Sequence, residues 1–96
     1  MAELNEETLC QIEGAVRAIL GKENDYSFQF SNAKGAEREN CAVLYKSLAI
    51  MGITKSTIAR RYGLTRQLYN YYANKYIVKD KDKLVMVLKG IREVLL

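Results

Sequence analysis

Histidine and proline are absent from this chain of 96 residues, and each absence excludes particular kinds of site or structure. Without histidine, mixed Cys/His zinc sites are excluded, and the usual acid–base and nucleophile arrangements of enzymes lose their commonest member. Without proline, no helix is interrupted by a ring that lacks an N–H. No apolar run approaches the ~18 residues of a membrane span. We therefore expect no metal, no cofactor, no membrane segment and no enzymatic activity.

Cysteine is scarce, and its two positions do not suggest a site. Cys10 and Cys41 show no metal-ligand spacing. The first residues are acidic and polar and lack the apolar stretch of a secretory signal, so we expect a cytoplasmic protein. In that compartment both thiols are expected to be reduced, and we predict that both are buried as small apolar side chains.

Acidic residues are missing from the whole stretch between Glu39 and Asp80. Residues 1–40 hold eight acids and four bases, whereas residues 41–96 hold eleven bases and three acids. A field of one sign attracts polyanions, so the basic part predicts a nucleic-acid partner. A solvated basic face without a partner is the alternative. The bases in the acid-free stretch are Lys46, Lys55, Arg60, Arg61, Arg66, Lys75 and Lys79.

Apolar residues recur at helical spacing over most of the chain, and 49% of its residues are apolar. The spacing predicts an all-α fold, a single domain of about five helices with a central helix-turn-helix. The expected helices cover residues 6–20, 33–51, 55–62, 66–76 and a last segment from Lys81 or Lys83 to Leu95, with Gly35 able to delay the second start. An acidic helix and loop form residues 1–35. In that loop, Tyr26, Phe28 and Phe30 are expected to act as aromatic anchors.

Residues 55–74 fit the demands of a helix-turn-helix, in which two short helices cross at roughly 90–120°. Counting from Lys55, the fifth residue must be small, and it is Ala59. The ninth must accept a positive φ, and it is Gly63. Thr54 and Thr65 precede the two helices as caps. The five core positions are also apolar: Ile58, Tyr62, Leu64, Tyr69 and Tyr72.

These residues resemble the helix-turn-helix family of DNA-binding proteins over about a fifth of the chain. The helix order is also similar to the all-helical group that contains the Trp repressor and the C-terminal domain of the bacterial replication initiator, with residues 36–51 and 54–76 as the common core. The initiator's recognition helix carries an Asp-His-Thr-Thr run. Here the chain reads Thr-Arg-Gln-Leu from Thr65, so origin binding does not carry over, and nothing indicates a tryptophan site.

The resemblance implies that residues 66–76 enter the major groove of double-stranded DNA. Arginine can bind guanine, and glutamine or asparagine can bind adenine. The predicted base contacts are Thr65, Arg66, Gln67, Asn70, Tyr71 and Asn74. The predicted phosphate contacts are Lys55, Ser56, Thr57, Arg60, Arg61, Lys75 and Lys79. The alternative for each is an exposed polar residue that contacts water.

Two functions follow from the sequence, and a third is disfavoured. The first is a sequence-specific transcriptional regulator, acting as a possible homodimer through its first or its last helix. The last helix is apolar around much of its circumference, which a helix buried on two sides of one subunit also explains. The second is a non-catalytic protein-interaction adaptor. Catalysis is disfavoured because Glu37 and Glu39, two residues apart, do not face each other on a helix.

Overall fold

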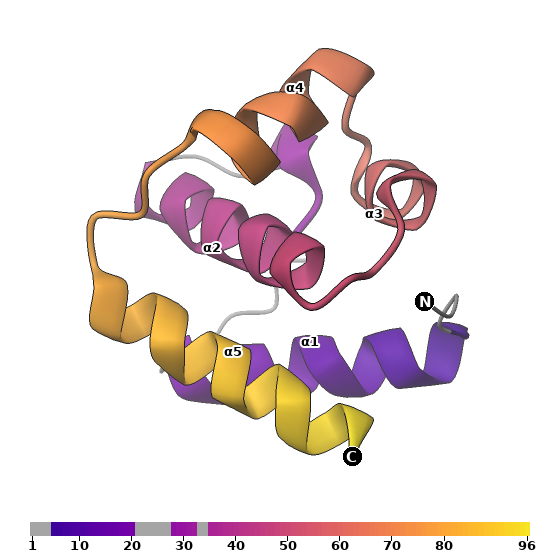
Figure 1. The fold of residues 1–96 in the computed structure, drawn as a ribbon, viewed down its shortest axis with the longest axis vertical. Helices are drawn as coiled ribbons and strands as arrows, with labels where there is room; N and C mark the ends of the chain where they lie inside the picture. The colour runs from indigo at the N-terminus through magenta and orange to yellow at the C-terminus, as the bar shows by residue number, and fades with distance from the viewer. Residues whose placement is uncertain (1–4, 21–27, 33–34) are drawn as a thin grey trace.

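Five α-helices make up most of the computed structural model, which describes residues 5–20, 28–32 and 35–96 (Figure 1). No strand occurs in these ranges, so the predicted all-α class is confirmed. A 3₁₀ turn, η1, and a π-helical turn, η2, complete the order. The bounds are α1 (Glu6–Leu20), η1 (Phe30–Asn32), α2 (Ala36–Ile50), α3 (Lys55–Tyr62), α4 (Arg66–Asn70), η2 (Tyr71–Lys75) and α5 (Lys81–Leu95).

Short polar side chains set the helix starts. The carboxamide of Asn5 accepts a hydrogen bond from the Thr8 N–H at 2.8 Å, and Asp80 accepts one from the Lys83 N–H at 3.1 Å. These caps confirm the predicted starts of α1 and α5. The second helix begins at Ala36, later than the predicted residue 33, because Gly35 has a φ of 59° and a non-helical ψ of −128°. Residues 33 and 34 lie outside the described ranges.

Helix α2 is the centre of the fold. In Figure 1 it runs between the α1–α5 pair on one side and α3 with α4 on the other. A helix enclosed in this way needs buried side chains beyond a single apolar stripe. The helical spacing of Cys41, Leu44, Tyr45, Leu48 and Met51 predicts that stripe; the first four are buried and Met51 is partly buried. Ala42, Val43 and the polar Ser47 are buried in addition. The elements α3, η2 and α5 each pack against α2, whereas α1 packs mainly against α5, and α4 mainly against α3 and η2.

Helices α1 and α5 lie side by side and close one face of the core. Gly90 permits their approach, because a Cβ at this position would come within 2.5 Å of the Ile19 Cδ1. Helix α5 also contacts α2, and the Lys83 ammonium donates to the side-chain oxygen of buried Asn40 at 3.1 Å. Helix α5 thus contacts two neighbours within one subunit, which is the alternative that the sequence left open beside a dimer surface. It still leaves Val85 and Met86 exposed.

The two cysteines differ in environment. Cys41 is buried in α2, as predicted, but Cys10 is exposed, so the prediction that both are buried is wrong. Cys10 lies outside the buried stripe of α1, which is formed by Leu9, Ile12 and Val16. The Cys10 thiol lies 3.6 Å from a Glu6 oxygen, on the polar side of the helix. Both thiols are free.

Candidate nucleic-acid interface

The turn between α3 and α4 has the geometry that the sequence predicts. Gly63 adopts the left-handed conformation, with φ 71° and ψ 34°, and the next N–H, of Leu64, donates to the Ala59 carbonyl at 2.9 Å. The hydroxyl of Thr54 accepts from the Thr57 N–H, and that of Thr65 accepts from the Leu68 N–H. Both predicted caps are confirmed. Helices α3 and α4 are in contact across this turn.

Tyrosine rings fill the space that aliphatic side chains would leave between these helices and α2. The Tyr45 ring centroid lies 5.3 Å from that of Tyr62 and 5.5 Å from that of Tyr72. The Tyr45 hydroxyl donates to the Phe28 carbonyl at 2.6 Å. Burial raises the pKa of Tyr45 and of Tyr62, which keeps both hydroxyls protonated as donors. Phe28 is buried and anchors its loop as predicted, whereas Tyr26 lies outside the described residues.

The expected recognition helix changes its winding halfway. Residues 66–70 are α-helical, and residues 71–75 form the π-turn η2, in which the Tyr76 N–H donates to the Tyr71 carbonyl at 2.7 Å. The Lys46 ammonium, from α2, donates to the Ala73 carbonyl at 3.3 Å and binds this end to the core. Tyr76 is already extended, so the helical segment ends one residue before its predicted end.

All six predicted base-contact residues are exposed. Five of them, from Arg66 to Asn74, follow the spacing of one outward face, opposite Tyr72, which packs into the core, and Thr65 precedes them as the cap of α4. Tyr71 is 46% exposed, and its ring rests edge-on against those of Tyr72 and Tyr76. The face therefore presents one arginine, three amide side chains, a hydroxyl and an aromatic ring. It includes no acidic residue.

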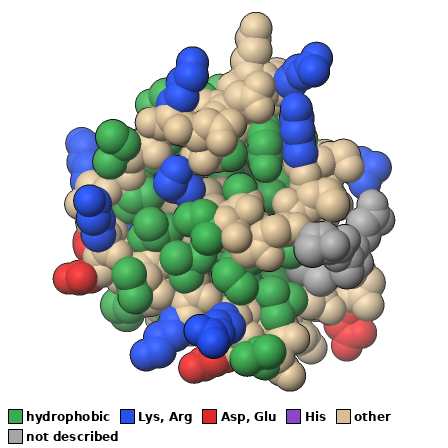
Figure 2. Space-filling model, in the orientation of Figure 1, with side chains coloured by type: hydrophobic (Ala, Val, Ile, Leu, Met, Phe, Trp, Pro, Cys, Tyr) green, Lys and Arg blue, Asp and Glu red, His purple; other side chains and the backbone are tan. Residues whose placement is uncertain are grey.

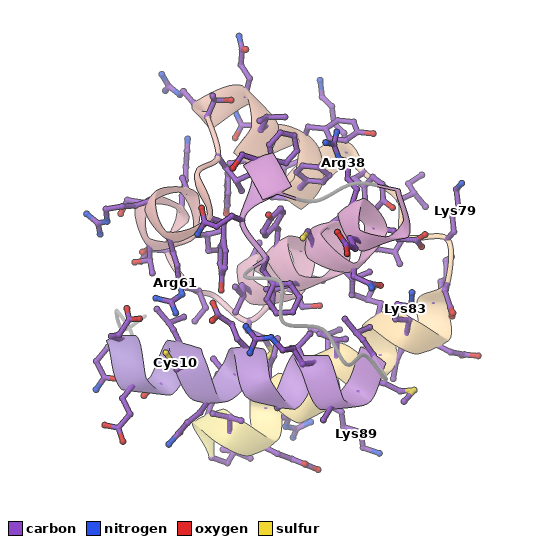
Figure 3. The ribbon with its side chains drawn as sticks, turned by 180° about the vertical axis from the view of Figure 1, so that it is seen from behind. Cys10, Arg38, Arg61, Lys79, Lys83 and Lys89 are labelled. Atoms are coloured by element: carbon purple, nitrogen blue, oxygen red, sulfur yellow. The ribbon has the colours of Figure 1, made fainter. Side chains whose placement is uncertain are left out.

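Five of the seven predicted phosphate contacts are also exposed: Lys55, Ser56, Arg60, Lys75 and Lys79. The Lys55 ammonium lies 5.8 Å from the Tyr69 ring centroid, so the start of α3 lies close to α4. Lys79 lines a pocket of about 350 Å³ together with Tyr71 and with Glu39 of α2, and Figure 3 shows it at the edge of the molecule.

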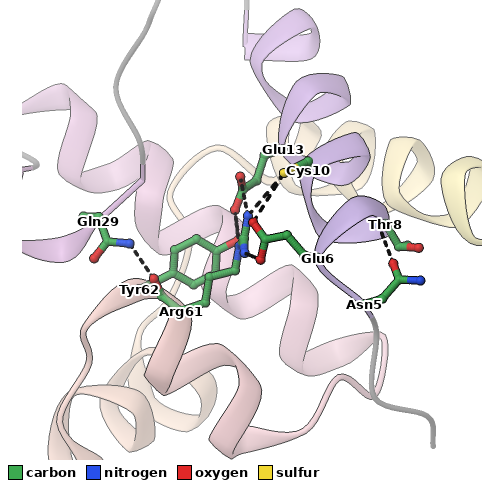
Figure 4. A network of polar contacts seen from close by, with 8 residues as sticks. All are labelled: Asn5, Glu6, Thr8, Cys10, Glu13, Gln29, Arg61 and Tyr62. Carbon is green, nitrogen blue, oxygen red and sulfur yellow. Dashed lines mark hydrogen bonds and ion pairs between the residues drawn. The ribbon is translucent and has the colours of Figure 1, made fainter.

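Two predicted phosphate contacts have other roles, and for them the prediction has to be corrected. The Thr57 side chain is buried, and its hydroxyl lies 2.7 Å from that of Thr54 in the cap of α3. The Arg61 guanidinium turns toward α1, where it contacts a Glu13 oxygen at 2.7 Å and a Glu6 oxygen at 2.6 Å (Figure 4). Its side chain is only 18% exposed. Arg61 therefore joins two helices instead of facing a ligand.

The sequence analysis did not predict this polar network, because the residues that Arg61 and Tyr62 contact on α1 are about fifty positions away in the chain. Buried Glu13 also accepts a hydrogen bond from the Tyr62 hydroxyl, and the Gln29 amide donates to the Arg61 carbonyl. Hydrogen bonding to Glu13 raises the pKa of Arg61, and hydrogen bonding to Arg61 lowers that of Glu6. The opposite charge of the two parts of the chain was the one signal that the acidic first helix could pair with the basic segment.

Other kinds of site find no support in the described ranges. They contain no group of histidine, cysteine or acidic side chains that could hold a metal ion. Within the same ranges, no helix has both the length and the apolar character to span a membrane. The chain matches no family model, and the comparisons with curated proteins and with solved structures find no match.

Proposed function

We propose that this protein binds double-stranded DNA in a sequence-specific manner and regulates transcription, with the start of α4 in the major groove. The observation that carries the proposal is the helix-turn-helix geometry around Gly63, combined with the exposed, acid-free face of α4 and η2. An α-helix fits the major groove of B-DNA, and its first residues are those that reach base edges in this kind of motif. The two free thiols fit a reducing compartment such as the cytoplasm.

Reading of sequence is assigned to the outward face of the α4–η2 segment. Arg66 can form a bidentate contact with guanine, and Gln67 and Asn70 can each form one with adenine. Thr65 uses its hydroxyl for the cap of α4, which leaves its methyl group for apolar contact with thymine. The rigid support of this face comes from Tyr72 in the core and from Lys46 on the Ala73 carbonyl.

We assign phosphate binding to the basic and hydroxyl side chains that are exposed beside this face. Lys55 and Ser56 begin α3, and Arg60 lies one turn further along the same helix. Lys75 extends the positive charge beyond the end of the recognition segment. Contacts of this kind fix the position of the protein on the duplex, and they contribute affinity that decreases with salt.

The proposal is tested by fluorescence anisotropy with mixed duplexes of about two helical turns, ~20 base pairs. Titrations at low and at moderate salt should show binding that weakens steeply with salt. A selection from random duplexes should then return a preferred site. Absence of binding at low salt would reject the proposal.

Arg66 is expected to contribute to sequence preference. Arg66→Ala should cost about 1–3 kcal/mol on the selected site and relax the preference at one base pair. Arg60→Ala is the matched control, because loss of a phosphate contact weakens binding to all sequences by a similar factor. If Arg66→Ala weakened every duplex equally, Arg66 would be reassigned to phosphate binding.

A homodimer is a second part of the proposal. One helix-turn-helix makes few base contacts, and two copies on half-sites about one helical turn apart double them. Sedimentation of the protein–DNA complex should therefore give two chains per selected duplex. A complex with one chain per duplex would remove this part without affecting the assignment of the binding face.

A further inference from the structure

An apolar groove lies beside the end of the α4–η2 segment and continues into a second groove along α5. Of the predicted base-contact residues, only Asn74 lines this pair of grooves. The first, of about 440 Å³, runs from Asn74 to α5 and contains Ile77, Val78 and Leu84. The second, of about 400 Å³, lies between the end of α2 and α5 and contains Ile50, Met51 and Leu88. Val85 lines both, so the two grooves form one surface. Figure 2 shows hydrophobic side chains over the middle of this side of the molecule.

The exposed aliphatic side chains of this surface have no structural role in the described chain that would explain them. Ile50, Ile77 and Val85 are 54%, 75% and 58% exposed. Single exposed aliphatic residues are common, but three along one pair of grooves form a contiguous patch. Burying such side chains against a partner is favourable, and part of that gain offsets the cost of association. The patch is therefore suited to an apolar partner.

Positive charge surrounds these grooves. Their lining includes Lys46 and Lys75 on one side and Lys81, Lys89 and Arg92 on the other, and no acidic residue is among the lining residues. If a second copy of the chain bound here, the same lysine and arginine side chains of the two copies would come together, and their repulsion would cost free energy. A partner with acids on either side of an apolar stripe meets the grooves with complementary charge.

We propose that this surface binds an acidic amphipathic α-helix of a partner protein. The rise from Lys81 to Arg92 along α5 is ~16 Å, which is the length of about three helical turns. A helix of that length can place aliphatic side chains at one-turn intervals into the two grooves on either side of Val85. Its flanking acids then reach the lysines and Arg92.

The same partner would oppose DNA binding. Asn74 and Lys75 line the first groove and also belong to the proposed DNA interface, so a helix seated there covers both. It also places acidic side chains where phosphates would approach. This competitive effect rests on the proposed function, whereas helix binding itself does not.

The test uses three synthetic peptides that share one leucine face and carry glutamate, glutamine or lysine on the polar face. Each is titrated into the ¹⁵N-labelled protein, without DNA, and followed by amide chemical shifts. The glutamate peptide should bind at least tenfold more tightly than the lysine peptide, with the largest shifts around Ile50, Ile77 and Val85. Equal binding of all three, binding elsewhere, or no binding of the glutamate peptide would overturn the proposal.

Two neighbouring residues of α5 provide the matched variants. Val85→Glu should weaken the glutamate peptide at least tenfold, whereas Met86→Glu should not, because Met86 is similarly exposed but lines neither groove. Ile77→Glu, outside any helix, replaces Val85→Glu should the latter lose its helical circular dichroism. A dimer that Val85→Glu dissociates and Met86→Glu retains would instead assign the surface to a second copy.

The competitive effect has a separate measurement. The glutamate peptide is added to a preformed DNA complex of the protein, and the anisotropy should fall toward that of free DNA. A peptide that binds the grooves but leaves the complex intact would overturn competition alone. If the chain binds no DNA at all, the peptide titration still decides on the grooves.

Discussion

Arg60 and Arg61 are adjacent in α3, but their surroundings differ. Arg60 is exposed, whereas Arg61 pairs with Glu6 and with buried Glu13. Arg61→Ala would remove both guanidinium N–H groups that donate to the buried Glu13 carboxylate, which should cost roughly 1–3 kcal/mol of stability. Arg60→Ala should change stability by no more than about 0.5 kcal/mol, as is usual for exposed positions. Under the proposed function Arg60 is a phosphate contact, so affinity for DNA should fall in the Arg60 variant.

Thermal unfolding and salt-dependent anisotropy of the two variants separate these roles. For a domain of this size, 1 kcal/mol corresponds to a shift of roughly 4–8 °C in Tm. The Arg61 variant should melt earlier and, below its Tm, keep the salt dependence of the parent. Equal melting temperatures would show that the network on α1 contributes little to stability.

Gly63 is the residue on which the turn depends most. Its φ of 71° disfavours any side chain, and a Cβ there would also touch the Gln29 side chain at 3.4 Å. Gly63→Ala should therefore destabilise by about 1–2 kcal/mol, with a larger loss for Gly63→Val. Gly14→Ala is the control, since that site is helical and open, and it should stabilise by up to ~1 kcal/mol. Chemical denaturation of the variants measures both, and a neutral Gly63→Ala would contradict the strained turn.

At the scale of elements, what could be predicted were the features encoded within one or two turns of chain. The caps Thr54 and Thr65, the turn at Gly63 and the apolar stripes each depend on neighbours three or four residues away. The start of α2 could be placed only as residue 33 or later, because the effect of Gly35 depends on its φ, which the residue type permits but does not impose. The π-turn after Asn70 was missed, because no local pattern distinguishes it from an α-helix.

The parts of the candidate site that were not predictable arise from packing between elements. The pairing of Arg61 with Glu13 requires that α1 lie against α3, which neither segment reveals alone. The same holds for the Lys46 contact with the Ala73 carbonyl. Sequence alone could identify the exposed face of α4. Which lysine and arginine side chains are exposed beside that face depends on how the helices pack.

At the scale of the whole molecule, ion pairs join the acidic first helix to the basic segment at Arg61. The free energy of unfolding should therefore depend on pH in the acid range. Hydrogen bonding to Arg61 lowers the pKa of Glu6 in the folded state. A lowered folded pKa means that the stabilisation is present above the unfolded pKa of about 4.3 and is lost as the pH falls through the folded value. Glu6→Gln should remove this part of the acid dependence.

The alkaline side has a different cause, namely the burial of groups that must stay neutral. Burial raises the pKa of the Cys41 thiol to about 11, and it also raises that of Tyr45 and Tyr62. In the unfolded chain a thiol ionises near ~8.5 and a tyrosine near ~10. Because the folded values are higher, the stabilisation is complete below the unfolded values and is lost as the pH rises above them.

The free energy of unfolding should therefore begin to fall above about pH 8.5 and fall more steeply above about pH 10, where the tyrosines join. Urea denaturation at a series of pH values measures this slope. Cys41→Ala should flatten the first part, between about pH 8.5 and 10, even though it lowers stability at neutral pH by leaving a small cavity. Cys10→Ala, at the exposed cysteine, is the control and should keep the parent slope. If Cys41→Ala kept that slope as well, the alkaline loss of stability would have to be assigned to the tyrosines around Tyr45 alone.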